Sequence, residues 1–237
     1  MGEIFRYEKF NEKLLSELTT TSKEIVIDYV EIGIDSIFAD EIIKEIPVLK
    51  TIAAVCNVGI AINERFFAKK IAVFIKEFHE KTISAEKLDK FKVKLESDSR
   101  YRDRVMDHVI VLLDRYIDVE KAKIIARFFS AYINELCSLE QFIEMSSSLD
   151  LVFLSDCEVL IDIYNKTKEL PSDAPNSFID FEEETGRKIF SSIGRLRANG
   201  LISARNVARF GGGPENHLDV ESRITEFGVM FCEVGLL

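Results

Sequence analysis

Apolar residues recur at helical spacing through the central part of the chain. They stand three or four positions apart from Val105 to Tyr116 and again from Ala122 to Ile133, which is the spacing of one face of an α-helix. Between Gly59 and Pro171 the chain has 111 residues with neither glycine nor proline. Because both residues interrupt helices, this stretch predicts a helical bundle.

Polar residues with capping chemistry mark the expected starts of several helices. A serine or threonine followed three residues later by Glu or Gln is typical of a capping box, in which each side chain binds a free backbone N–H. Asp118 is expected to cap the apolar run that follows it. The expected boxes are Thr21 with Glu24, Ser138 with Gln141, and Ser155 with Glu158.

The composition changes after Leu170. Eight of the eleven glycines lie beyond this point, and residues 171–177 have the composition of a loop. Helices are expected at 155–169 and 187–199, followed by two extended arms, 203–210 and 217–224, joined by a glycine turn. We therefore expect a mainly α protein with a helical bundle at 1–154 and a small α+β domain at 155–237.

Short motifs give the C-terminal part a resemblance to a winged helix-turn-helix domain. They are the apolar pair Ile193 and Leu196, the helix end Gly200-Leu201-Ile202, and the segment Ile224-Thr225-Glu226-Phe227-Gly228. The resemblance covers about the last third of the chain. It implies a helix and a two-stranded wing that together contact a partner.

Basic residues are concentrated in this part of the chain. Residues 185–213 contain six cations and no acidic residue, which leaves a net charge of −16 elsewhere in a chain of −10. On the helix from Arg187, one stripe is apolar, and a second carries cations and hydroxyls that suit phosphates or base edges. We expect either a module that reads DNA or one that binds protein while its arginines pair with the acidic bundle. The expected contact residues are Arg187, Lys188, Ser191, Ser192, Arg195, Arg205 and Arg209.

The most apolar segment, residues 46–62, has two interpretations. It is 17 residues long and includes Lys50 and Asn57, which is short for a membrane-spanning helix of about 20 residues. We favour a core helix of the bundle over an interfacial membrane segment, because the two polar interruptions suit a soluble core. The cations and aromatic residues that would support membrane contact are Lys50, Arg65, Phe66, Phe67, Lys69 and Lys70.

The sequence lacks the common catalytic motifs. The four cysteines are too far apart for a paired metal or redox motif, and no HExxH, GxSxG or Walker pattern occurs. Asp103, Asp107 and His108 share a helix edge, which suits a weak metal site or, as we favour, a solvated face with ion pairs. We expect a cytoplasmic protein that is not an enzyme and has no cofactor or metal.

Two further blocks resemble a group of uncharacterised bacterial proteins of the abortive-infection alpha type. One block runs from Pro47 to Lys70, and the other is the "T-x-x-G-x-x-F" segment from Thr225 to Phe231. The resemblance implies an accessory protein in phage defence or another stress response. We expect a helical effector or self-assembly body with a winged-helix recognition module, acting by self-association or on a protein partner. The alternative is a transcriptional regulator that binds DNA.

Overall fold

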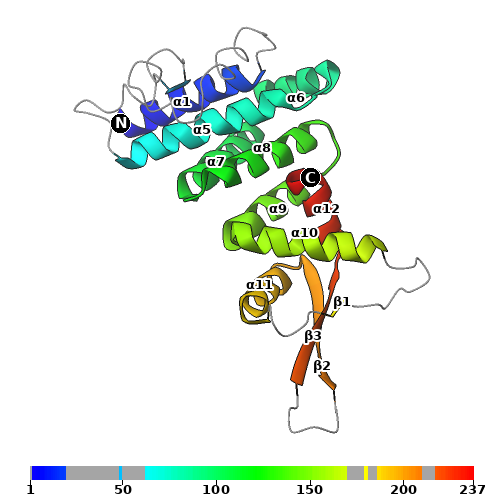
Figure 1. Cartoon of the computed structure of the whole chain (residues 1–237). Helices are drawn as coiled ribbons and strands as arrows, with labels where there is room; N and C mark the ends of the chain where they lie inside the picture. Colours follow the sequence, from blue (N-terminus) through cyan, green and yellow to red (C-terminus); the bar gives the residue numbers. More distant parts are fainter. Residues whose placement is uncertain (1, 20–47, 50–61, 170–178, 181–185, 210–216) are drawn as a thin grey trace. The chain divides into compact units, whose positions relative to one another are not determined.

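A computed structural model of the chain describes residues 2–19, 48–49, 62–169, 179–180, 186–209 and 217–237. The chain divides into two compact units, Met1–Ser146 and Ser147–Leu237. The boundary lies eight residues before the expected position after residue 154. The fold is mainly helical with a small antiparallel sheet, and Figure 1 shows these elements.

The first unit is built from helices in its described residues. Five of them follow one another in the glycine-free and proline-free stretch, which confirms the prediction of helices there, and the last of the five continues past the boundary into the second unit. The helices are α1 (Gly2–Thr19), α5 (Ile62–Glu80), α6 (Ala85–Ser97), α7 (Ser99–Arg115), α8 (Val119–Ile133) and α9 (Leu139–Leu151).

Capping side chains agree with the predictions at some of these boundaries, but Asp118, which precedes α8, makes no side-chain capping hydrogen bond. The Ser138 N–H donates to Gln141 Oε1 at 2.8 Å and the Gln141 N–H donates to Ser138 Oγ at 3.2 Å, which confirms that capping box. The expected box at Ser155 is wrong, because the next helix begins at Leu154. Asp156 reaches back there instead and accepts the Phe153 N–H at 2.8 Å. The expected box at Thr21 lies outside the described residues.

Aromatic side chains fill the core of the first unit. Phe129 of α8 is fully buried and lies between rings of α5 and α9, 5.9 Å from Phe74 and 5.6 Å from Phe142 between ring centroids. Helix α5 runs along α8 and also contacts α1. The large buried rings explain how helices with short connections hold together, since each ring removes about 150–250 Å² from water.

The second unit combines helices with a three-stranded sheet. Strand β3 is central and pairs antiparallel with β1 and β2, so the strand order is β1-β3-β2. Helix α10 contacts α11, β3 and the C-terminal helices. The elements are α10 (Leu154–Glu169), β1 (Ile179–Asp180), α11 (Gly186–Ala198), β2 (Ile202–Arg209), β3 (His217–Ile224), α12 (Glu226–Phe231) and the π-helix η3 (Cys232–Leu236).

Two glycines make the junction between α11, the hairpin and α12. Gly200 has φ +71°, the left-handed conformation that commonly ends a helix. Gly228 lies so close to β2 that a Cβ atom there would be 2.0 Å from the Leu201 carbonyl oxygen. Thr225 caps α12 by accepting the Gly228 N–H at 2.9 Å, and its hydroxyl also contacts the carbonyl oxygens of Gly200 and Leu201.

Candidate functional site

The solvent side of α11 is the first candidate contact surface. Phe190 is 52% exposed, and Ser191, Gly194 and Arg197 on the same side of the helix are also exposed. A Cβ atom added at Gly194 would have no neighbour within 4 Å. On the opposite side, Ile193 and Leu196 are buried against the rest of the unit, as the apolar stripe predicted.

Two of the predicted contact residues on α11 bind within the unit instead. Arg195 donates from Nε and from an Nη atom to the two carboxylate oxygens of Asp156, both at 2.7 Å. Its guanidinium also lies 4.8 Å from the Phe153 ring centroid. Ser192 is 5% exposed and hydrogen-bonds to the same carboxylate. The polar stripe of α11 therefore includes residues that face solvent and residues that bind inside the unit. We remove Ser192 and Arg195, which bind inside the unit, from the contact surface.

The Asp156 carboxylate is the centre of this internal cluster. It has no exposed surface and belongs to the first turn of α10. Burial opposes its ionisation, but hydrogen bonds from Arg195, Ser192 and the Phe153 N–H outweigh burial and lower its pKa. The cluster thus joins α10 to α11 through a charged carboxylate.

The remaining predicted cations of the second unit are only partly described. Arg205 is exposed on β2, where the strand register places Glu221 of β3 opposite it. The side chains of Arg187, Lys188 and Arg209 lie outside the described residues. The unit is not basic as a whole, because residues 147–237 contain 15 acidic and 9 basic residues.

The connection between α10 and α11 differs from a tight helix-turn-helix. Sixteen residues, 170–185, separate the two helices, and they include strand β1. In a DNA-binding helix-turn-helix the turn has about 3–4 residues. The spacing therefore does not match the tight arrangement that positions a helix in the major groove.

The predicted membrane-contact residues have several different environments. Lys70 is 4% exposed and donates to the carbonyl oxygens of Asp114 at 2.8 Å and Tyr116 at 2.7 Å, so it caps the end of α7. Phe67 lies 5.8 Å from Phe10 of α1 between ring centroids. Phe66 is 47% exposed, whereas Arg65 and Lys69 are half-buried.

Most of the apolar segment 46–62, with Lys50, lies outside the described residues. Val48 and Leu49, which are described, are fully buried, in line with the core interpretation at these two positions. In the described part of the chain, none of the helices combines the length and the apolarity needed to cross a membrane. Lys70 therefore acts as a buried capping residue, and we remove it from the candidate membrane contacts.

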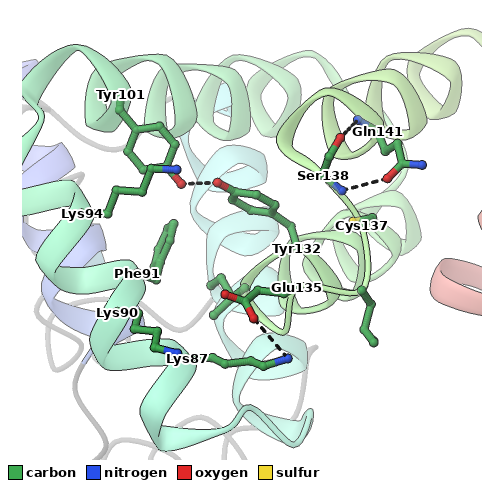
Figure 2. A pocket seen from close by; sticks show the side chains of 12 residues that line it. Lys87, Lys90, Phe91, Lys94, Tyr101, Tyr132, Glu135, Cys137, Ser138 and Gln141 are labelled. Carbon is green, nitrogen blue, oxygen red and sulfur yellow. Dashed lines mark hydrogen bonds and ion pairs between the residues drawn. The ribbon is translucent and has the colours of Figure 1, made fainter.

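A pocket in the first unit is the second candidate site, and sequence reasoning missed it. Its volume is about 480 Å³, and it lies between α6, α7 and the segment from α8 to α9. Figure 2 shows three lysines of α6 along one side and aromatic rings behind them. The lining residues used below are Lys87, Lys90, Lys94, Phe91, Tyr101 and Tyr132.

The titratable groups of the pocket suit binding better than nucleophilic chemistry. Tyr101 and Tyr132 hydrogen-bond through their hydroxyl groups, and burial raises the pKa of both, so both phenols stay neutral. Burial also raises the pKa of the Cys137 thiol on the pocket wall to about 11. Because the thiolate is the reactive form, this cysteine is a poor nucleophile at neutral pH.

Asp103, Asp107 and His108, which the sequence allowed as a weak metal site, make contacts of other kinds. The ring Nε2 of His108 is 2.7 Å from Ser146 Oγ, and Asp107 accepts a long hydrogen bond from Asn11 at 3.5 Å. Asp103 accepts from its neighbour Arg102 at 3.1 Å. Within the described ranges, no group of three or more His, Cys, Asp or Glu residues is arranged to hold a metal ion.

No protein-family model, curated protein or solved structure matches this chain. The resemblances to winged-helix domains and to abortive-infection alpha-type proteins therefore stay predictions from sequence motifs.

Proposed function

We propose that the second unit is a winged-helix-like recognition module that binds an acidic protein surface through the exposed side of α11. The first unit is a helical body that acts as an effector or self-assembles once the second unit has bound its partner. The protein is not an enzyme in this proposal. The observation that carries it is the exposed Phe190 beside Ser191, Gly194 and Arg197 on one helix face.

The exposed residues have the chemistry of a protein contact. Aromatic residues and arginine dominate the binding energy of protein interfaces, usually at the centre of the contact. Phe190 leaves about half of its surface in water, so covering the ring gives a favourable hydrophobic contribution. Gly194, four residues along the helix, leaves space for a partner backbone to approach.

The charge distribution favours an acidic partner. Residues 185–213 contain six cations and no acidic residue, and five of these cations remain after Arg195 is paired with Asp156. A second copy of this protein is one such partner, because the rest of the chain carries a net charge of −16. A contact between different surfaces of two copies is head-to-tail and supports extended assembly.

The same contacts weigh against DNA as the partner. Ser192 and Arg195, two of the seven predicted contact residues, bind Asp156 inside the unit. The long connection before α11 departs from the tight turn of a DNA-reading pair of helices. A net charge of −10 also repels a polyanion.

The biological setting comes from the motif resemblance alone. Phage defence or another stress response is what the abortive-infection alpha-type resemblance implies, and we keep it as the proposed context. Genes for defence systems beside the gene for this protein would support the context, whereas a divergent operon would favour transcriptional regulation.

The proposal is tested by the association state of the full chain. Mass photometry at about 50 mM and about 500 mM salt should show oligomers that dissociate as salt screens the contact. Phe190→Ser and Arg197→Glu should each shift the protein toward monomer. Two matched controls in the same unit should not: Leu237→Ser removes an apolar side chain of similar exposure, 62%, and Lys166→Glu reverses an exposed charge on α10.

A partner other than a second copy is tested by crosslinking. A photoreactive residue at Ser191, introduced in cells, should crosslink to a protein, while the same residue at Lys166 should not. The proposal is contradicted by a strictly monomeric chain that also gives no crosslink at Ser191. It is equally contradicted by salt-dependent binding of genomic DNA fragments that Arg197→Glu abolishes.

A further inference from the structure

The pocket of the first unit has an unusual row of charges along one side. Lys87, Lys90 and Lys94 stand at positions i, i+3 and i+7 of α6, so they share one helix face with Phe91. Like charges three or four residues apart repel each other in a helix. Functional sites are places where proteins tolerate such a local cost.

Acidic neighbours balance only part of this charge. Glu86 is 2.7 Å from the Lys90 ammonium group, and Glu135 is 3.6 Å from that of Lys87. The three lysines and these two carboxylates leave an excess of one positive charge, and of the two carboxylates only Glu135 lines the pocket. A wall with this excess suits an anionic group, and a phosphate monoester carries about two negative charges at neutral pH.

The back of the pocket is aromatic. The Phe91 ring lies edge-on to the rings of Tyr101 and Tyr132, at centroid distances of 6.5 Å and 6.1 Å. The Lys94 ammonium group lies 4.0 Å from the Tyr101 ring centroid. Figure 2 shows this lysine beside the paired tyrosine hydroxyls, so the cationic and aromatic parts of the wall adjoin each other. A flat ligand ring can stack on such side chains.

The size and the hydrogen-bonding groups fit a small organic molecule. A volume of about 480 Å³ lies within the range of about 300–1,000 Å³ that is typical of ligand pockets. The two phenols are neutral, and Gln141 uses its Oε1 for the Ser138 N–H, which leaves its amide nitrogen as a donor. The wall therefore offers neutral polar groups beside the lysines and the rings.

We propose that this pocket binds an organic phosphate that carries an aromatic ring, of the size of a nucleoside monophosphate. The lysines of α6 hold the phosphate, and the rings of Tyr101 and Tyr132, which pack on the buried Phe91, contact the aromatic part. Binding involves no covalent step. The site is separate from the proposed contact surface on α11, so either one can fail without the other.

The test uses isothermal titration calorimetry on the full chain with four nucleoside monophosphates. At least one should bind saturably, whereas its nucleoside and inorganic phosphate should each bind at least about tenfold more weakly, because each lacks one half of the ligand. Tyrosine emission is a second readout, since the chain has no tryptophan.

Lysine variants on α6 distinguish specific binding in the pocket from a general attraction between opposite charges. Lys90→Gln and Lys94→Gln should each weaken binding about tenfold, the effect of losing one charged hydrogen bond. The matched control is Lys92→Gln, an exposed lysine of α6 that does not line the pocket; its affinity should stay within about twofold. Circular dichroism checks that all three variants keep their helix content.

Three results would overturn the proposal. They are the absence of saturable binding by all four nucleotides, equal affinity for inorganic phosphate and the nucleotide, and a loss in Lys92→Gln as large as in Lys94→Gln.

Discussion

Replacing Gly228 by alanine should strongly destabilise the second unit. The new Cβ would lie 2.0 Å from the Leu201 carbonyl oxygen and 2.8 Å from an Ile224 side-chain carbon, so the backbone must move. Overpacking of this kind costs about 1–3 kcal/mol. The same carbonyl accepts the Thr225 N–H at 3.1 Å and the Thr225 hydroxyl at 3.0 Å, and losing both bonds costs about 1 kcal/mol each.

The substitution to alanine also offsets part of this loss in the free energy of unfolding. It favours a helix over glycine by about 0.5–1 kcal/mol, so the net destabilisation should be about 2–4 kcal/mol. This is a large fraction of a typical unfolding free energy of about 5–15 kcal/mol. Gly194→Ala is the matched control, because a Cβ there meets nothing within 4 Å; it should stabilise by about 0.5–1 kcal/mol.

Hydrogen exchange measured by mass spectrometry resolves these effects within the full chain. In Gly228→Ala, peptides from α10, α11 and α12 should lose protection, while peptides from α8 serve as an internal reference in the other unit. Equal protection in Gly194→Ala and Gly228→Ala would refute the reasoning, as would a loss of protection confined to α8.

Three further predictions concern the internal contacts. Arg195→Ala should lower the urea midpoint of the second unit and Arg197→Ala should leave it unchanged, because only Arg195 binds the buried Asp156; equal midpoints would contradict this. The depressed pKa of Asp156 stabilises the fold above the unfolded value of about 4, and this contribution is lost as the pH falls from about 4 through the lower folded pKa. An acid titration should therefore show a smaller stability loss in Asp156→Asn than in the parent. Lys70→Met should cost about 1–3 kcal/mol in urea unfolding, because it leaves two carbonyl groups at the end of α7 without their donor.

Much of the fold follows from local sequence patterns. Expected helix 187–199 is Gly186–Ala198 in the structure, and the two arms differ from strands β2 and β3 by one residue at most. These elements carry their own signals, such as the apolar stripe of Ile193 and Leu196 and the glycine after the helix. The predicted start of α10 was wrong because two residues, Ser155 and Asp156, could each cap the helix. Asp156 binds the Phe153 N–H, and this contact begins the helix one residue earlier.

The candidate sites follow less directly, since they depend on contacts between distant residues. The sequence places Ser192 and Arg195 on one helix stripe, but it does not show that Asp156, 39 positions before Arg195, takes both. The sequence contains one feature that could have indicated the pocket, the three lysines around Phe91 on α6. Its other rings come from α7 and α8, so only the packing of the helices brings the wall together.

The motifs that suggested a family have a structural explanation in this chain. Gly200 is needed for its left-handed conformation, Thr225 caps α12, and Gly228 allows α12 to approach the Leu201 carbonyl group. Each residue serves the junction between a helix, a hairpin and the next helix, whatever the unit binds. Proteins that share this junction can therefore share the motif without sharing a partner. In our proposals function instead depends on Phe190 and Arg197 on α11 and on the lysines of the α6 pocket wall, because these side chains reach solvent or the pocket rather than the junction.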